Sequence, residues 1–394
     1  MRFVGIDVGA ERHVVAGVDE AEAVVIPPTG FTEDAAGYHQ LRTLLGPATD
    51  TLVALEATGH YWKNVFAVLV SAGFAVALLN PLRTRRFAEE DLQRTKTDTI
   101  DALGIARFAG QKRPAATPLP DPATEELREL LRYRDRLSQD FGDRERQLHR
   151  LLDLGFPEFP RHVHDVGSEL ATAILRDYPT AAAFQGVAVR RLAGLRYDGR
   201  HKVGTDLATT LLTAAAGSVG QHHGAAYRVQ VRDACADLDV LRGRLRTLDR
   251  DIERLLEDHE VGTLLTTIEG IGPQTAARLV ATFGDFSGVR SAAALASYVG
   301  VIPGLRQSGK RTSVRASLTP IGAARLRAKL YMPVLSAVRH NPWLRAYYVR
   351  LIGRGKLPKV AIIAAMRKLL HAVYSVATHR RPFTPHVVTQ EARA

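Results

Sequence analysis

Short apolar segments follow one another along the first 80 residues of the chain. RFVGIDV, HVVAGVD and EAVVIPP (residues 2–8, 13–19 and 22–28) are separated only by the charged joints GAER and EAE. Brief β-branched runs with short polar joints predict three strands in a hairpin meander. TLVALEA and FAVALLN (residues 51–57 and 74–80) predict a fourth and a fifth strand.

Amphipathic segments lie between and after these strands. They predict one helix over residues 31–46, with Thr32 as its N-cap, and another over residues 60–73. Pro81 begins a basic helical stretch, and a further helix ends near Gly110. Three meandering strands followed by strand, helix, strand and helix is the order of a ribonuclease-H-like α/β domain.

Two long polar segments in the middle of the chain repeat apolar residues with the spacing of a heptad. The first segment, residues 122–153, has Leu127, Leu130, Leu137, Phe141, Leu148 and Leu151 at the a and d positions. Arg134 and Arg144 interrupt that seam. The second segment, residues 226–258, steps through Val231, Ala234, Leu238, Leu241, Leu245, Leu248, Ile252 and Leu255. These helices predict an antiparallel coiled-coil hairpin or a dimerising stalk, and a pair of ordinary bundle helices is the alternative.

The last part of the chain is predominantly helical. It begins near Thr263 with TIEGIGPQTAARLVATFGDF, in which Gly270 and Gly272 form a turn that is typical of a helix-hairpin-helix. Backbone N–H groups at such a turn bind phosphate without regard to sequence. The alternative is a tight turn that requires glycine for its backbone conformation.

The elements together predict three domains and a tail. An α/β, ribonuclease-H-like domain covers residues 1–112, and a coiled-coil helical middle covers residues 122–258, with a mostly helical insertion at about 156–225. A mostly helical domain follows at residues 263–380, and residues 381–394 form the tail. The insertion carries no residue pattern that indicates a chemistry.

Positive charge gathers at the end of the chain. Residues 301–394 contain 18 Lys and Arg against one acid, Glu391, so +17 lies there and the total of +12 leaves −5 for residues 1–300. A quarter of a chain that is this basic indicates a polyanionic partner. The basic residues are spread over several helices and not over one amphipathic face, which disfavours a membrane surface.

Composition excludes several other classes of protein. The single cysteine, Cys235, allows no internal disulfide and no cysteine-based zinc site, and it lies beside the second heptad seam, where packing is its expected role. The N-terminus lacks the pattern of a leader peptide. No apolar run is expected to approach the length of a membrane span.

Four carboxylates are candidates for one site. Asp7 ends the first strand and Glu56 ends the fourth, and these strands are neighbours in a ribonuclease-H-like sheet. Asp98 and Asp101 are three apart on a helix, which places them on one face. We expect that helix to pack across the edge where Asp7 and Glu56 lie.

Carboxylate oxygens are the protein ligands that Mg²⁺ prefers. A set of four can hold two Mg²⁺ ions about 3.5–4 Å apart, which is the spacing for phosphoryl transfer. Salt bridges to Arg94 and Lys96 are the alternative explanation for Asp98 and Asp101.

Several segments together resemble a known family. GIDVG, ALEATGHYW and KTDTIDA are similar to the DEDD, RuvC-like domain of transposases of the insertion-sequence one-ten family. IEGIGPQTAARLVATFGDF, ASYVGVIPGLRQSGKRTS, IGAARLRAKLY and GRGKLPKVAIIAAMRKLL resemble its second, transposase-20-type domain. The two resemblances cover residues 1–110 and about 263–376.

The resemblance implies a DNA transposase or recombinase of an insertion sequence. It implies guidance by an element-encoded non-coding bridge RNA that selects donor and target DNA, and a Mg²⁺-dependent DEDD site made of Asp7, Glu56, Asp98 and Asp101. It further implies a composite site, completed between protomers, in which a serine of the second domain forms a phosphoserine intermediate. A homo-oligomer follows, as a dimer or as a tetramer on DNA. The expected location is the prokaryotic cytoplasm, in association with the nucleoid.

The serine of the resemblance corresponds best to Ser308 in PGLRQSGKRTS, and Ser313 and Ser317 are the alternatives. A serine hydroxyl is a weak nucleophile until a base or metal activates it. The nearby cations expected to bind phosphate are Arg306, Lys310 and Arg311. Further basic residues are expected to contact nucleic acid and to set the salt dependence of binding. They are Arg83, Arg85, Arg86, Arg315, Arg325, Arg327 and Lys329.

Trp343, Tyr347 and Tyr348 lie among arginines in NPWLRAYYVR. Such rings can stack on unpaired RNA bases, although the apolar face of a helix is the favoured interpretation here. Two rival functions remain. One is a RuvC-like, Mg²⁺-dependent, structure-selective nuclease in which water cuts DNA without a covalent intermediate. The other is a nucleic-acid-binding scaffold without catalysis, which the complete carboxylate set argues against.

Overall fold

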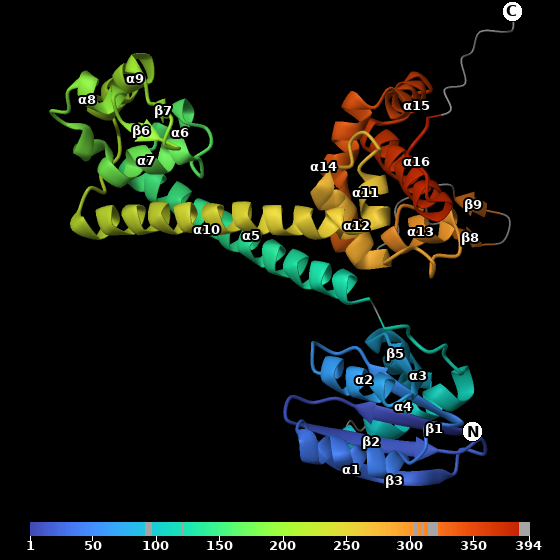
Figure 1. The fold of residues 1–394 in the computed structure, drawn as a ribbon. Coiled ribbons are helices and arrows are strands. Elements are labelled where there is room, and N and C mark those ends of the chain that lie inside the picture. The colour runs from blue at the N-terminus through green and yellow to red at the C-terminus, as the bar shows by residue number, and fades with distance from the viewer. Residues whose placement is uncertain (91–96, 120, 303–305, 309–310, 314–321, 386–394) are drawn as a thin grey trace, which may run out of the picture. The chain divides into compact units, whose positions relative to one another are not determined.

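The computed structural model describes residues 1–90, 97–119, 121–302, 306–308, 311–313 and 322–385 (Figure 1). For residues 306–308 and 311–313 it describes the backbone. The chain divides into two compact units, residues 1–120 and residues 121–394. The expected three-domain division stays a prediction.

The first unit is built on a five-stranded mixed sheet in the order β3-β2-β1-β4-β5. Its strands are β1 (Arg2–Asp7), β2 (Arg12–Val18), β3 (Val24–Thr32), β4 (Thr51–Glu56) and β5 (Ala75–Leu79). The first three strands pair antiparallel, and β1, β4 and β5 pair in parallel. The five predicted strands and the neighbourhood of the first and fourth are therefore confirmed.

Helices cover both faces of this sheet, namely α1 (Ala35–Leu45), α2 (Trp62–Ser71), α3 (Pro81–Glu90) and α4 (Asp98–Lys112). Residues from α1 and α2 form a core with Val4, and residues from α3 and α4 form a second core with Phe3. Neighbouring residues of β1 thus point into different cores. A sheet that is buried on both faces explains why its central strands are continuous apolar runs.

The predicted N-cap of α1 is wrong. Thr32 is the last residue of β3, which extends four residues beyond its predicted end, and Asp34 caps the helix by accepting a hydrogen bond from the N–H of Gly37 at 2.7 Å. Thr32 instead donates from its hydroxyl to the Asp34 carboxylate. A strand at the edge of a sheet tolerates Pro27 and Pro28, which is why the strand pattern continues past them.

Contact at backbone level fixes the direction of α4 across β1. A Cβ atom built on Gly5 would lie 2.2 Å from the carbonyl oxygen of Ala102 and 2.4 Å from the nitrogen of Ala106. One built on Gly110 would lie 3.4 Å from the ring of Phe3. Residue numbers on α4 therefore fall as those on β1 rise. The N-terminal end of α4 consequently lies toward Asp7.

The second unit contains two long helices, α5 (Pro122–Gly155) and α10 (Ala225–Glu257), as predicted. Arg134 pairs with Asp249 at 2.5 Å and Arg144 pairs with Asp237 at 3.0 Å. Because one residue number rises as its partner's falls, the helices run antiparallel. The charged residues that interrupt the predicted seam thus find partners across it. Of the predicted alternatives, the structure shows the antiparallel hairpin, and a dimerising role stays a prediction.

A small, mostly helical lobe joins the two long helices. Its elements are α6 (Phe159–His162), α7 (Glu169–Asp177), η1 (Ala181–Phe184), α8 (Val189–Ala193), β6 (Arg196–Tyr197), β7 (His201–Lys202) and α9 (Thr205–Ala216). Its core includes Leu148 of α5 and Leu238 of α10. Cys235 is fully buried in that core, and burial raises the pKa of its thiol to about 12. Its expected role in packing is confirmed.

The opposite ends of α5 and α10 join a second core (Figure 1). The elements there are α11 (Glu260–Leu265), α12 (Pro273–Phe283), α13 (Ala292–Val299), β8 (Arg306–Ser308), β9 (Arg311–Ser313), α14 (Ala324–His340), α15 (Pro342–Gly353) and α16 (Pro358–His379). The described part of this region is mostly helical, as predicted.

The expectation that no apolar run approaches membrane-span length is wrong for α16. Within the described ranges this helix alone is long and apolar enough, with 22 residues and a mean hydropathy of 1.5 in its best window. Over half of that window is buried inside the protein. Its length and composition are those of a helix at the centre of a core, where most sides need apolar residues.

We expect Gly5→Ala to destabilise the first unit by about 1–3 kcal/mol. The added methyl group would overlap the backbone of α4, which cannot rotate away as a side chain could. Urea unfolding followed by Trp62 fluorescence, in a Trp343→Phe background, reports this unit alone.

Gly104→Ala on α4 is the matched control, because a Cβ atom there meets nothing within 4 Å. It should stabilise the same transition by about 0.4–1 kcal/mol. An unchanged midpoint for Gly5→Ala would contradict the proposed close contact.

Candidate functional site

Asp7 and Glu56 end two neighbouring parallel strands. The register of β1 on β4 runs to the pair Ile6 and Leu55, so the next residue of each strand is one of the two acids. Both acids are half-buried. The structure therefore brings these two predicted site residues to the same edge of the sheet.

Two threonines hold the Glu56 carboxylate. The hydroxyl of Thr84, on α3, donates to one carboxylate oxygen at 2.8 Å, and the hydroxyl of Thr58 donates to the other at 2.9 Å. Thr84 is buried. A carboxylate held at both oxygens is restricted in orientation. Neither threonine belongs to the predicted site, because the polar partner of a strand-end acid has no signal in a single sequence.

Asp98 and Asp101 lie in the first turn of α4. Thr97 caps that helix with its hydroxyl, which accepts a hydrogen bond from the N–H of Ile100 at 3.3 Å. The N-terminus of a helix favours negative charge, so this is a favourable place for two acids. Asp101 is half-buried and Asp98 is exposed. Since the N-terminal end of α4 lies toward Asp7, all four predicted carboxylates belong to one edge of the unit.

The four acids do not form a closed cluster. Among the described residues, no three His, Cys, Asp or Glu side chains lie close enough together to hold a metal ion. The donors at this edge are all carboxylate oxygens, which is the ligand type that suits Mg²⁺. Arg94 and Lys96, the alternative partners of the two aspartates, lie outside the described residues.

A buried histidine supports the loop that follows Asp7. His13 is 1% exposed, and its Nδ1 accepts a hydrogen bond from the N–H of Gly9 at 3.3 Å. Its Nε2 therefore carries the proton and donates to Glu33 at 2.5 Å, while Asn64 donates to the other Glu33 oxygen at 2.8 Å. This chain of bonds ties Gly9 to Glu33, which directly follows β3, and through it to Asn64 of α2. The sequence signal is a polar residue at an inward position of an apolar strand.

Ser308 is the last residue of β8 in the second unit. The antiparallel register of β8 and β9 pairs it with Arg311 and pairs Arg306 with Ser313. Directly opposed residues, and residues two apart, share a face of a ribbon. These four positions therefore share a face. Lys310, Arg315 and the alternative nucleophile Ser317 lie outside the described residues.

α3 carries exposed arginines close to the acidic edge. Thr84 of this helix holds Glu56, while Arg83, Arg85 and Arg86 are exposed. Arg85 pairs with Glu89 at 3.0 Å, and an exposed pair of this kind contributes little stability. These cations remain accessible to a phosphate.

Arg327 and Lys329, two predicted phosphate contacts, are engaged inside the second unit. Arg327 donates to the carbonyl of Val299 at 2.9 Å, at the C-terminus of α13. Lys329 pairs with Asp135 of α5 at 2.9 Å. Their intramolecular bonds give them structural roles, and a contact with nucleic acid stays a prediction. Arg325 on the same helix is exposed.

Asp135 joins three helices. Arg278 of α12 binds both of its oxygens at 2.9 Å, in addition to Lys329 of α14. Burial raises the pKa of Asp135, but the hydrogen bonds from Arg278 and Lys329 outweigh it, so the pKa lies below its ordinary value of 3.8. The hairpin of long helices is fastened to the C-terminal helices at this point.

The glycine turn before α12 has a structural explanation at one of its two glycines. Gly270 has a φ of +98°, and a Cβ atom there would lie 2.3 Å from that of Ala337 on α14. Gly272 has an ordinary backbone and open space around it. Backbone conformation and close packing thus require glycine at 270, and phosphate binding at this turn stays a prediction.

Two family models match the chain. One, a transposase model of the DEDD IS110 type, matches residues 4–157, and the other, the transposase IS116/IS110/IS902 family, matches residues 262–349. The first spans the acidic edge and α5, and the second spans β8, β9 and α14.

Similar proteins align over nearly the whole length. The 44.8 kDa protein of insertion element IS116 from Streptomyces clavuligerus is 30% identical, over 99% of this chain and 98% of its own. The 43.6 kDa protein of insertion element IS110 from Streptomyces coelicolor is 27% identical, over 95% and 93%. The pilin gene-inverting protein of Moraxella bovis is 26% identical, over 91% and 90%.

We expect Asp135→Asn to destabilise the second unit by about 1–3 kcal/mol, because it weakens two charge-assisted hydrogen-bond partners at once. A lowered pKa means that this stabilisation is complete above pH 3.8 and is lost as the pH falls through the lowered value. The wild-type and variant curves should therefore differ fully at neutral pH and converge in acid.

Unfolding followed by Trp343 fluorescence in a Trp62→Phe background measures this unit. Asp143→Asn on the same helix is the control, since Asp143 and its partner Arg146 are both exposed. Equal losses in the free energy of unfolding for the two variants would show that the position of Asp135 between helices does not matter.

Proposed function

The chain belongs to the IS110 family of insertion-element transposases, and from this membership we propose how it cuts and rejoins DNA. It is a DNA transposase or recombinase, and DNA is its substrate. The proposal is that a Mg²⁺-dependent DEDD site and a nucleophilic serine act together under the guidance of a bridge RNA. The observation that carries it is the shared edge of Asp7 and Glu56, toward which α4 directs Asp98 and Asp101.

We assign the first unit to the ribonuclease-H-like, RuvC-like class. Three antiparallel strands followed by two parallel ones, in the order β3-β2-β1-β4-β5, support this assignment. The boundaries expected from the sequence, with domains at residues 1–112, 122–258 and 263–380, belong to the same proposal.

The carboxylate oxygens of the acidic edge are the ligand type that Mg²⁺ prefers, and the proposal places two ions there. Asp7, Glu56, Asp98 and Asp101 would hold them through carboxylate oxygens, and the hydroxyls of Thr58 and Thr84 keep Glu56 in one orientation. When bound, such ions polarise a phosphate and stabilise the charge that develops on its oxygens. Exposed arginines of α3 bind neighbouring phosphates and position the strand.

The nucleophile in this proposal is the Oγ atom of Ser308. It forms a bond to the phosphorus of the scissile phosphate as the bond from phosphorus to the leaving sugar oxygen breaks. The proton of the hydroxyl passes to a base, and the leaving oxygen takes up a proton. Attack by a sugar hydroxyl of another strand then reverses these changes, joins the strands and restores the serine. The phosphoserine linkage is itself a phosphodiester, so it retains the free energy of the cleaved bond. No further energy source is therefore required for rejoining.

RNA guidance rests on the family and on charge. Residues 301–394 contain 18 Lys and Arg and only one acid. This number of cations suits a large polyanion in addition to the DNA substrate. The exposed Val240 of α10 supports a homo-oligomer formed through this hairpin. The prokaryotic cytoplasm, at the nucleoid, is the proposed location.

A covalent trapping assay tests the serine. Purified protein, RNA transcribed from the flank of the element, Mg²⁺ and labelled donor DNA are incubated and denatured, and label that migrates with protein is measured. We expect an adduct in the wild type and none in Ser308→Ala or Asp101→Asn. Ser313→Ala is the matched control on the same hairpin and should keep the adduct.

The same assay distinguishes the rivals. Mg²⁺-dependent cleavage without adduct, unchanged in Ser308→Ala, would establish a water-using RuvC-like nuclease. An adduct that forms equally well without RNA would overturn the guidance but keep the serine. Metal-independent binding of nucleic acid with no strand cleavage would indicate a nucleic-acid-binding scaffold without catalysis.

We expect Thr84→Val to lower the cleavage rate about 10–100-fold, because partners that orient a metal ligand have effects of this size. Thr84→Ser keeps the hydroxyl and should retain most of the rate. The Mg²⁺ concentration for half-maximal rate should rise in Thr84→Val, which a purely structural role would not cause. Equal rates for valine and serine at this position would remove Thr84 from the site.

A further inference from the structure

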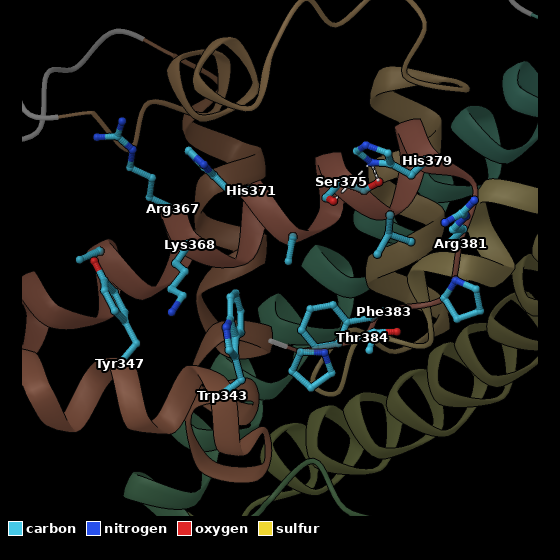
Figure 2. Close-up of a pocket in the computed structure, with 15 residues that line it drawn as sticks. Trp343, Tyr347, Arg367, Lys368, His371, Ser375, His379, Arg381, Phe383 and Thr384 are labelled. Carbon is cyan, nitrogen blue, oxygen red and sulfur yellow. Dashed lines mark hydrogen bonds between the residues drawn. The ribbon is translucent and has the colours of Figure 1, made fainter. Parts of the chain in front are cut away.

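A groove of about 760 Å³ runs along α16 in the second unit (Figure 2). Trp343 and Tyr347 of α15 line it, with Lys368 and His371 of α16 and with Phe383 from the segment that follows α16. Its volume is in the range of pockets that hold small ligands. Most of its lining lies beyond residue 349, where the second family match ends.

Aromatic rings in this groove pack against the core of the second unit and also lie beside a cation. The Nζ atom of Lys368 lies 4.2 Å from the ring centre of Trp343 and 4.5 Å from that of Tyr347 (Figure 2). Phe383 meets Trp343 edge to face at 5.4 Å. The residue of α15 that enters the core is Leu344, which is fully buried. Trp343 and Tyr347 are half-buried and pack against that core, which agrees with the favoured interpretation of an apolar helix face, and their remaining surface lines the groove.

Within the described residues, the cations of the groove have no acidic partner. In the described ranges, Arg367, Lys368 and Arg381 form no ion pair, whereas the neighbouring Arg380 binds Glu260 at 3.1 Å. Burial, and then the charge of Arg350, lower the pKa of Lys368. Positive groups that lie close together and are partly desolvated repel one another when no anion is bound between them. A bound anion would relieve that repulsion.

A histidine beside these cations has an unsatisfied nitrogen. The Nε2 atom of His371 is buried and has no hydrogen-bond partner within the described structure. Burial, and then Arg367, lower the pKa of this imidazole, so it is neutral at pH 7. Buried polar atoms nearly always have a partner. A ligand with hydrogen-bonding groups would supply one.

We propose that this groove holds an unpaired nucleotide of a nucleic-acid strand. Its base stacks on Trp343 and Tyr347, and its phosphate lies beside Lys368 and Arg367. Stacking on aromatic rings together with backbone contacts to cations is how proteins hold single strands. A base inside a duplex is already stacked on its neighbours and does not reach these rings, so the site selects unpaired nucleotides. The inference deepens the proposed function, because it names where the nucleic acid is held.

Fluorescence of Trp343 reads the groove directly. Trp62 and Trp343 are the two tryptophans of the chain, so full-length Trp62→Phe protein reports Trp343 alone. The probes are a single-stranded RNA, a single-stranded DNA of the same sequence and the duplex DNA. We expect both single strands to quench the fluorescence and the duplex to leave it nearly unchanged. The strand that binds more tightly identifies the natural source of the nucleotide.

Lys368→Gln tests the site by affinity for the single strand, and Lys359→Gln is its matched control. Both remove one charge from α16, but Lys359 is exposed and outside the groove. Lys368→Gln should weaken single-strand binding about tenfold or more, and Trp343→Leu should do the same. Lys359→Gln should weaken single strands and duplex alike, by a small factor. Thermal unfolding of each variant separates a lost site from a lost fold.

Two results would overturn the proposal. One is equal quenching by duplex and single strands, and the other is equal affinity of Lys368→Gln and Lys359→Gln. The covalent trapping assay separates this failure from a failure of the proposed function. If the groove tests fail but the Ser308-dependent adduct still forms, the groove proposal alone is overturned.

Discussion

The acidic site depends on one backbone contact, between Gly5 of β1 and α4. Only hydrogen occupies the space that separates Gly5 from the backbone of Ala102 and Ala106. With α4 seated this closely, its axis lies against β1 and its acidic first turn lies toward Asp7. A side chain at position 5 would lift the helix, and Asp98 and Asp101 would move away from Asp7 and Glu56. Parallel pairing of β1 with β4 places Asp7 and Glu56 at neighbouring strand ends.

Charge organises the second unit in two ways. Ion pairs between Arg134 and Asp249 hold α5 and α10 in register, and Asp135 fastens the pair to α12 and α14. Cations used in this way stabilise the packing of the helices. The cations along α16 differ, because they lie beside half-exposed rings and the described structure gives them no acid. Basic residues in one region thus divide into those that stabilise the fold and those that remain for a polyanion.

Catalysis by such a chain requires that acids, hydroxyls and cations be held in order. Glu56 is held by two hydroxyls, and Gly9 is tied through His13 to Glu33. These groups sit outside the predicted DEDD set, but they limit the positions that its members can adopt. Such restriction lowers the reorganisation needed when a phosphate binds. The proposed groove would act at the level of recognition, since it holds a nucleotide without reacting with it.

The sequence by itself determined most of the elements and supplied the candidates for their chemistry. Apolar runs of period two and heptads predict the five strands and the two long helices, and acids at strand ends predict the carboxylate set. Burial of Cys235 also follows from its place beside the heptad seam. These patterns depend on residues a few positions apart, which a single sequence displays. The N-cap at Thr32 was wrong because Asp34 competes for the same role two residues later.

Only the tertiary structure decided which residues meet. The direction of α4, the hydrogen bond from Thr84 to Glu56 across 28 residues and the bond from Arg278 to Asp135 across 143 residues depend on packing between distant segments. It also decided that Leu344 enters the core while Trp343 lines a groove, although both lie in one helical turn. The physical reason is that a local pattern records the apolar face of an element, but the partners of that face are set by how whole elements pack.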